Sequence, residues 1–174
     1  MLNSSDKLRF EHLVLPHLDA AFNLAFWLVP SCKDAEEVVY EALFVSYRPF
    51  LSSQGTAARA FLLQLVHNCA YRRLHQNQTV ESISEVQEDL NSAVDPAQPL
   101  LTAAIEDREL LVHALELLSP QFRELIVLRE LEGCSYQEIA IITSIPRGRV
   151  MHALHCARRH LQLTLMRLSR TKPL

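Results

Sequence analysis

Between residues 118 and 161 the chain carries signals for helix starts and stops at short intervals, and this stretch constrains the fold most strongly. Ser119 followed by Pro120 predicts a helix start, because serine caps free N–H groups and proline fits the first helical position. Gly133 predicts the end of that segment, since glycine tolerates the left-handed backbone found just after a helix. A short helix is therefore expected between these two signals.

A second helix and then a longer third one are expected to follow. Ser135 and Glu138 have the spacing of a capping box, in which each side chain bonds the other residue's backbone N–H. Pro146 marks the next break, and the third helix is expected to begin near Arg147. Three helices with two tight breaks therefore occupy little more than forty residues.

The third helix has two contrasting faces. Its apolar residues recur at intervals of four, three and four, which places them in one narrow stripe: Val150, Leu154, Ala157 and Leu161. The opposite face and the helix start carry Arg147, Gly148, Arg149, His152, His155 and Arg159. An apolar stripe behind a basic, hydrogen-bonding face is typical of a DNA-reading helix-turn-helix.

The same segment resembles the C-terminal domain of extracytoplasmic-function sigma factors, the small promoter-specificity subunits of bacterial RNA polymerase. The residues that carry the resemblance are Leu118, Ser119, Pro120, Arg123, Glu124, Leu128, Arg129, Glu132, Gly133, Cys134, Ser135, Tyr136, Glu138, Ile139, Ala140, Ile145, Pro146, Gly148, Val150, Leu154, His155, Ala157 and Arg158. The family usually has Thr, Lys, Ser, Arg and Arg at the places held here by Arg149, Met151, His152, Ala153 and Cys156. The resemblance implies that the third helix reads the promoter's −35 element through Arg147, Arg149, His152, His155, Arg158 and Arg159.

Charge is distributed unevenly along the chain. The formal net charge is −3, but residues 74–107 hold seven acids and no lysine or arginine, and no acid follows Glu138. Such asymmetry favours an interaction with nucleic acid at the basic end. One alternative is that these basic residues form an ordinary solvated tail. Because they coincide with the third helix, they favour a surface that binds DNA phosphates.

Composition limits the other classes of protein. Among 174 residues, 49% are apolar and only three are glycine, which favours a helical fold with a real core. The amino-terminal residues lack the layout of a signal peptide, and the four cysteines form no CxxC pair, so we expect a cytoplasmic protein. No nucleophile with base and orienting group, and no glycine-rich phosphate loop, is present, so no enzyme activity, cofactor or small-molecule substrate is expected.

A metal site is also not expected. His152, Cys156 and His160 lie four residues apart in turn, but only adjacent pairs at that spacing can share one ion, and zinc needs more ligands. We place these side chains on the DNA face or against a partner instead.

The first part of the chain is predicted to form helices around an acidic one. A helix over 8–29 is expected to be interrupted at Pro16, and a second helix begins near residue 33, with Val38, Ala42 and Val45 facing inward. Its outer stripe of Asp34, Glu37 and Glu41 has the spacing of an ordinary solvated face. Resemblance to the sigma family implies a second reading, in which Asp34, Glu36, Glu37 and Glu41 dock on the clamp of the polymerase's largest subunit.

In this first part of the chain, a turn-rich loop is expected over 49–56. A further helix follows it, from Thr56 to about residue 76. It resembles the family helix that contacts the −10 element, which implies that Asn68, Arg72 and Arg73 bind DNA. Asn68 has an alternative reading as a core-edge residue that bonds neighbouring backbone.

We expect an all-α protein of two small helical domains joined by an acidic flexible linker, the C-terminal one a helix-turn-helix. The boundaries are 1–75 for a sigma region-2-like domain, 76–100 for the linker, and 101–174 for a sigma region-4-like domain. About 25 residues of coil reach roughly 80 Å when fully stretched.

The resemblance implies an alternative sigma factor that binds core RNA polymerase, directs transcription initiation at promoter DNA, and has an anti-sigma factor as a further partner. Two alternatives stay open. One is a sigma-like protein that has lost promoter reading and acts as a protein-binding module or decoy. The other is a conventional helix-turn-helix regulator, which would not need the acidic clamp-facing helix.

Overall fold

A computed structural model describes residues 4–52, 58–78 and 105–171, and within these ranges the chain is helical between short turns and contains no strand. The elements are α1 (Ser4–Val14), η1 (Leu15–His17), α2 (Leu18–Leu28), α3 (Cys32–Ser52), α4 (Ala58–Gln78), α5 (Ile105–Glu116), α6 (Pro120–Ile126), η2 (Val127–Leu131), α7 (Tyr136–Thr143) and α8 (Arg147–Thr171). The predicted all-α class is confirmed. Among the described helices, none is long and apolar enough to cross a membrane.

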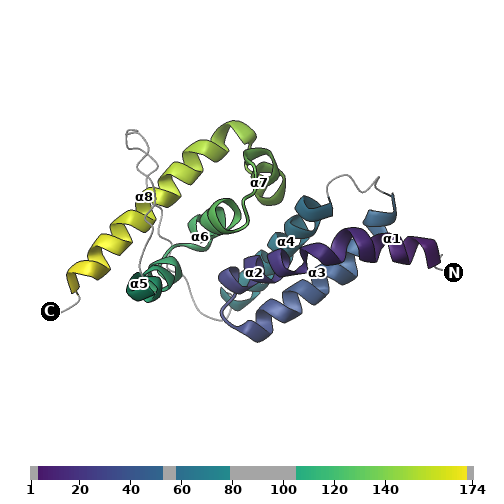
Figure 1. Ribbon diagram of the computed structural model, residues 1–174, viewed down its shortest axis with the longest axis horizontal. Helices are drawn as coiled ribbons and strands as arrows, with labels where there is room; N and C mark the ends of the chain where they lie inside the picture. Colours follow the sequence, from purple (N-terminus) through teal and green to yellow (C-terminus); the bar gives the residue numbers. More distant parts are fainter. Residues whose placement is uncertain (1–3, 53–57, 79–104, 172–174) are drawn as a thin grey trace.

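The first half of the chain is a bundle in which α2, α3 and α4 pack on one another (Figure 1). The helix predicted over 8–29 is interrupted as expected, because Pro16 lies in the single 3-10 turn η1 that separates α1 from α2. The fully buried side chains of this bundle include Leu24, Leu28, Val38, Leu62 and Leu63. These side chains pack α3 and α4 together and leave the opposite faces of both helices exposed.

Two details of α3 differ from the prediction. The loop expected from Pro49 begins later, because α3 continues to Ser52 and Pro49 lies in its last turn, where the missing N–H removes one helical hydrogen bond without ending the helix. The rest of that predicted loop lies outside the described residues. Val45, expected to face inward, is 44% exposed, and Ser46 is the buried residue at that level. The inner stripe therefore turns by one residue near the end of α3.

The second half contains the predicted helix-turn-helix. Pro120 is at the start of α6, Gly133 has a φ of 63°, and the capping box of Ser135 and Glu138 is complete, with both side chains bonded to the other residue's backbone N–H. Ser144 ends α7 with a φ of 59° and turns the chain toward α8. Cys134, which lies between η2 and α7 in the chain, is buried, and this burial raises the pKa of its thiol to about 11.

The helix after Pro120 changes its winding before Gly133. Residues Val127–Leu131 form a π-helical turn, in which Glu132 donates its N–H to the Val127 carbonyl five residues back at 2.9 Å. The N–H of Cys134 donates to the Leu128 carbonyl at 2.8 Å and closes the end of this segment. π-Helical turns occur mostly as single turns inside α-helices, frequently at functional sites. Here the turn sets the direction in which the chain enters α7.

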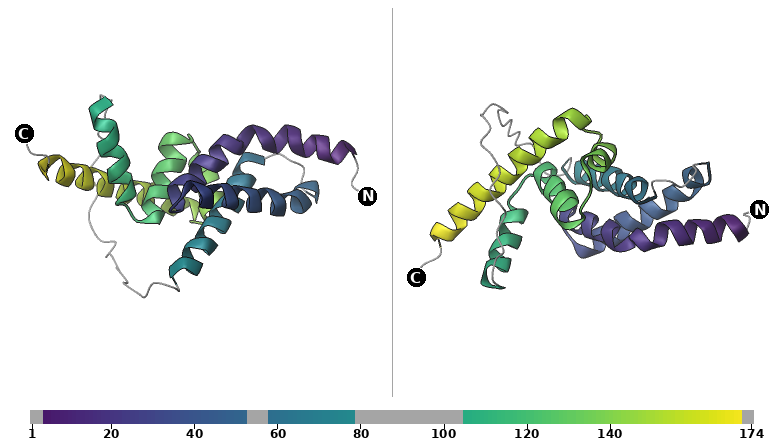
Figure 2. Two further views of the ribbon diagram at one scale, coloured as in Figure 1. Left: turned by 90° about the horizontal axis from the view of Figure 1, so that it is seen from below. Right: turned by 45° about the horizontal axis from the view of Figure 1, so that its top comes forward.

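The two halves are packed against each other through α4 on α7 and α2 on α6 (Figures 1 and 2). The buried residues of both halves belong to one continuous apolar core. In Figure 1, α1 and the far end of α8 lie at opposite ends of the molecule, and the contact between the halves is central. The division of the sequence near residues 75 and 100 stays a prediction, and most of the predicted linker lies outside the described residues.

Candidate nucleic-acid and polymerase interfaces

The helix α8 has the two faces that its sequence predicts. Val150, Leu154, Ala157 and Leu161 are all buried, with Leu161 the most exposed of them at 1%. The opposite face is exposed at Arg147, Gly148, Arg149, His152 and Arg159, and half-buried at His155. Pro146 accepts a hydrogen bond from the Arg149 N–H at 2.8 Å, which fixes the first turn of the helix. Two guanidinium groups are therefore exposed at the helix N-terminus, the end by which a recognition helix enters the major groove.

Arg158 lies in a different environment from the other predicted DNA-binding residues of α8. Its guanidinium donates through Nε and Nη2 to Glu130 Oε1, at 2.9 and 2.6 Å. This ion pair joins α8 to the π-turn η2, and each of its two side chains is 38% exposed. Arg158 thus joins α8 to the rest of its half of the chain, and its guanidinium could bind a phosphate only if that pair were broken.

His152 and Cys156 are adjacent on α8, with Nε2 and Sγ 3.6 Å apart. In the described ranges, no group of three or more His, Cys, Asp or Glu side chains is placed to hold a metal ion. His160 lies under a ring of the neighbouring helix instead, with its centroid 4.6 Å from that of Phe122. His160 therefore lies in a different environment from His152 and Cys156, although the three share one sequence spacing.

The predicted polymerase-binding and −10-binding residues face one another across α3 and α4. Arg73 bonds Asp34 Oδ1 at 2.9 Å and also pairs with Glu37, while Arg72 Nη1 lies 2.8 Å from Glu41 Oε1. Asp34 also receives a hydrogen bond from the Ser31 hydroxyl, which with the Arg73 charge lowers the pKa of that carboxyl. The two sets of charges, predicted to serve separate partners, thus partly neutralise each other in this structure.

Glu36 is the exception among the four acids, because it is exposed and makes no ion pair within the described ranges. Tyr40 and Phe44 follow it at intervals of four and are 74% and 78% exposed. An outward stripe of one acid and two aromatic rings is therefore present on α3. The sequence analysis missed the two rings, although their spacing from Glu36 was the signal that could have found them.

Asn68 is exposed on α4. This position disfavours its alternative reading as a core-edge residue and leaves its amide available to a ligand. Its neighbours one turn away are engaged: Gln64 donates to the Ile141 carbonyl at 2.9 Å, and Arg72 pairs with Glu41. Of the three predicted −10 contacts, only Asn68 is therefore unpaired by α3.

Comparison with known proteins first defines the class of the second half. Residues 108–161 match the family described as Sigma-70, region 4. That segment begins within α5 and ends at the last buried residue of the α8 stripe. This segment, whose core is the helix-turn-helix described above, is therefore similar to sigma-70 region 4.

The comparisons then extend to nearly the whole chain. It is 27% identical to the RNA polymerase sigma-H factor of Pseudomonas aeruginosa, over 95% of this chain and 90% of that protein. It is 29% identical to the ECF RNA polymerase sigma-E factor of Escherichia coli K12, over 90% and 86%. Against the ECF RNA polymerase sigma factor SigE of Mycolicibacterium smegmatis the identity is 26% over 88% of this chain, which spans only 60% of that protein.

A solved structure has the same arrangement of helices. The sigma factor RpoE, in complex with the anti-sigma factor NepR from Bartonella quintana, aligns with a TM-score of 0.68 and 26% identity over 91% of this chain and 97% of that one. In sequence and in fold the chain is thus similar to extracytoplasmic-function sigma factors over most of its length.

Proposed function

We propose that the chain is an alternative sigma factor, which binds core RNA polymerase and directs it to a set of promoters. The observation that carries this proposal is the α7–α8 helix-turn-helix, matched as region 4, with Arg147 and Arg149 exposed at the start of α8. Relatives aligned over most of their length carry the name RNA polymerase sigma factor, which supports the same role here. The protein works by binding and has no catalytic step of its own, and its place of action is the cytoplasm.

The DNA contacts are assigned by helix. In this proposal residues 101–174 form the −35-reading domain, with Arg147, Arg149, His152, His155 and Arg159 facing the duplex. Residues 1–75 open the −10 region, with Asn68 as the free side chain and Arg72 and Arg73 released from α3 on binding. Arginine pairs with guanine in a bidentate manner, which supports a base-reading role at the helix start.

The polymerase contact is assigned to the outer face of α3. Glu36, Tyr40 and Phe44 form an exposed stripe there, beside Glu37 and Glu41, and Asp34 lies one turn earlier. Acids beside exposed aromatic rings suit a basic protein surface, because charge steers the encounter and rings supply the buried area. An anti-sigma factor is a further proposed partner, supported by the aligned RpoE, whose structure was solved in complex with NepR.

Reconstitution tests the proposal directly. The purified chain is mixed with core polymerase, and transcription is mapped on a library of genomic fragments from the source organism. The account expects a defined set of start sites that core polymerase alone does not use. An Arg147→Ala/Arg149→Ala variant is the matched control and should bind core polymerase but lose most of those starts. Binding to core without any promoter-specific start would support the decoy alternative instead.

A further inference from the structure

The outward face of α8 carries a pair of side chains whose atoms can bind a transition metal ion. His152 Nε2 lies 3.6 Å from Cys156 Sγ, and the two residues are one helical turn apart. His152 is exposed, while Cys156 is half-buried and its thiol is free rather than part of a disulfide. Imidazole nitrogen and thiolate sulfur are the two commonest protein ligands of zinc. The pair therefore has the right donor atoms, and both side chains are accessible from solvent.

The separation of the two atoms also suits zinc. Zinc binds thiolate sulfur at about 2.3 Å and imidazole nitrogen at about 2.0–2.1 Å, in a tetrahedral arrangement. A tetrahedral angle between these two bonds sets sulfur and nitrogen about 3.5–3.6 Å apart, which agrees with the 3.6 Å between Sγ and Nε2. Without a metal, the same contact serves as a hydrogen bond between the thiol and the ring. The pair thus needs no rearrangement to receive an ion.

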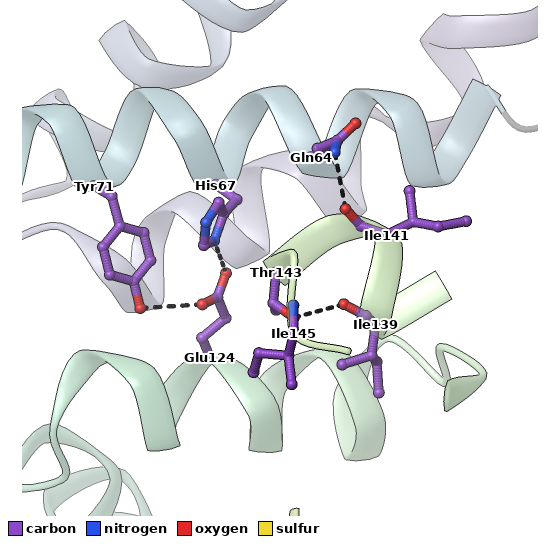
Figure 3. A network of polar contacts seen from close by, with 8 residues as sticks. All are labelled: Gln64, His67, Tyr71, Glu124, Ile139, Ile141, Thr143 and Ile145. Carbon is purple, nitrogen blue, oxygen red and sulfur yellow. Dashed lines mark hydrogen bonds and ion pairs between the residues drawn. The ribbon is translucent and has the colours of Figure 1, made fainter. Parts of the chain in front are cut away.

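The helix holds this pair on a rigid support. The apolar stripe on the opposite side of α8 is fully buried, which fixes the rotation of the helix about its axis. The turn that leads into α8 is fixed as well, because the Thr143 hydroxyl donates to the Ile139 carbonyl at 2.7 Å and accepts the Ile145 N–H at 3.4 Å (Figure 3). Ligands on a well-supported helix keep their spacing whether or not an ion is bound.

The pair forms an open site and not a closed one. Structural zinc sites almost always have four protein ligands, whereas in the part of the chain that the structure describes no group of three or more His, Cys, Asp or Glu side chains is placed to hold an ion. His160, which continues the sequence spacing, packs on Phe122 instead. Two protein ligands leave the other coordination positions to water. Such an ion binds reversibly and stays accessible to a further ligand.

The pair also lies in a gap in the positive charge of this face. Arg149 and Arg159 are exposed on it, but residues 150–157 between them include no lysine or arginine. A neutral imidazole and a neutral thiol add no charge. When zinc binds, the thiol proton is lost to water, so zinc with one thiolate and one imidazole carries one net positive charge. Its water positions can be exchanged for a phosphate oxygen or for guanine N7, which is an acceptor in the major groove.

We propose that His152 and Cys156 form a reversible zinc site on α8, and that the bound ion adds a further contact to promoter DNA. The site stands on the geometry of the pair, whereas the DNA contact rests on the proposed function. Arg149 and Arg159 lie one turn to either side and repel a dication in the free chain, and DNA phosphates offset that repulsion. Zinc therefore binds more tightly on DNA, and by reciprocity DNA binds more tightly to the zinc-loaded protein.

Cobalt(II) is the probe for the site itself, because it replaces zinc and gives a near-ultraviolet absorption band when a thiolate is among its ligands. The full chain, freed of metal by dialysis against a chelator, is titrated with cobalt and followed by absorption. We expect saturation at one cobalt per chain, and loss of the band on adding zinc, which binds more tightly. Cys156→Ser and His152→Ala should abolish this band. Cys32→Ser, at the exposed cysteine of α3, is the matched control and should keep it.

The outcomes of the titration decide the site. Absence of a thiolate band in the full chain, even in large excess of cobalt, overturns the zinc site, and so does a band that Cys156→Ser retains. Saturation at one cobalt per two chains overturns the open coordination, because a second copy would then supply the remaining ligands. These measurements involve neither polymerase nor promoter, so their result is independent of the proposed function.

The DNA contact is tested with holoenzyme on a promoter fragment, at two salt concentrations, with zinc or with a chelator. We expect zinc to tighten wild-type binding several-fold and to steepen the salt slope by about 1. Cys156→Ser, which is outside the assigned DNA contacts, should show neither effect, and any response of core polymerase to zinc is common to both holoenzymes. Equal responses of the two overturn the DNA contact. Failure of the wild-type holoenzyme to bind any promoter, with or without zinc, overturns the proposed function instead.

Discussion

The helix α4 makes two sets of charged contacts, and they differ in almost every physical respect. Toward α3, Arg72 and Glu41 are 53% and 42% exposed, and Arg73 meets two acids at the surface. Toward α6, His67 and Tyr71 meet Glu124, whose side chain is 3% exposed. Exposed pairs are screened and contribute little, whereas a buried acid loses heavily when its partners are removed. The first set is easily exchanged for DNA or protein; the second holds the halves together.

Removing the acid of each set should give the largest contrast. Glu124→Ala deletes a buried acceptor and leaves His67 and Tyr71 without their partner, so we expect the free energy of unfolding to fall by about 3 kcal/mol. Glu41→Ala, the matched control on α3, should cost less than about 1 kcal/mol. Urea unfolding followed by circular dichroism measures both. Equal losses for the two variants would abolish the distinction between the sets.

A smaller effect is expected from the Tyr71 hydroxyl. Burial, together with the Glu124 charge, raises the pKa of Tyr71 well above its usual value near 10. The folded chain keeps this proton while the unfolded chain loses it, so stability is lost as the pH rises above about 10. Tyr71→Phe should lose about 2 kcal/mol at neutral pH and show a flatter alkaline decline. Unfolding curves at several pH values test this, and parallel declines for both proteins would contradict it.

The exposed set makes a prediction about polymerase. Glu36 is the acid of the α3 stripe, and it has no ion pair within the described residues. Glu36→Lys should therefore weaken binding to core polymerase by about 1 kcal/mol, roughly fivefold. Glu41→Lys acts on a charge already neutralised by Arg72 and should change affinity less. Fluorescence titration with core polymerase at moderate salt compares them. A larger effect at Glu41 would mean that the α3–α4 pairs open on docking.

The sequence predicted local features well because their causes lie within one or two helical turns. The capping box of Ser135 and Glu138, the turn at Gly133 and the buried stripe of α8 depend on spacing alone. The pairing of Arg73 with Asp34 could not be found in that way, because 39 residues separate them and helix packing decides their distance.

Two side chains within the region 4 match show the same limit. Glu124 carries part of the family resemblance, but nothing in its neighbourhood indicates burial, since His67 and Tyr71 precede it by 57 and 53 residues. Arg158 was assigned to DNA from the family resemblance, and only the fold brings Glu130 against it. The exposure of Val45 could not be predicted for the same reason. Helical spacing shows which side chains lie on one face, but only the packing of the helices decides which of them are buried.

The central claim, that α8 reads promoter DNA, is tested most directly by holoenzyme binding to a randomised −35 element at two salt concentrations. Arg149 is at the helix start, so Arg149→Ala should relax sequence preference by about 1–3 kcal/mol at one position. Arg159 lies further along the same face, so Arg159→Ala should weaken all sequences alike and lower the salt slope by about 1. If neither variant changes preference or occupancy, α8 does not read DNA and the account of this chain as a promoter-reading sigma factor is contradicted.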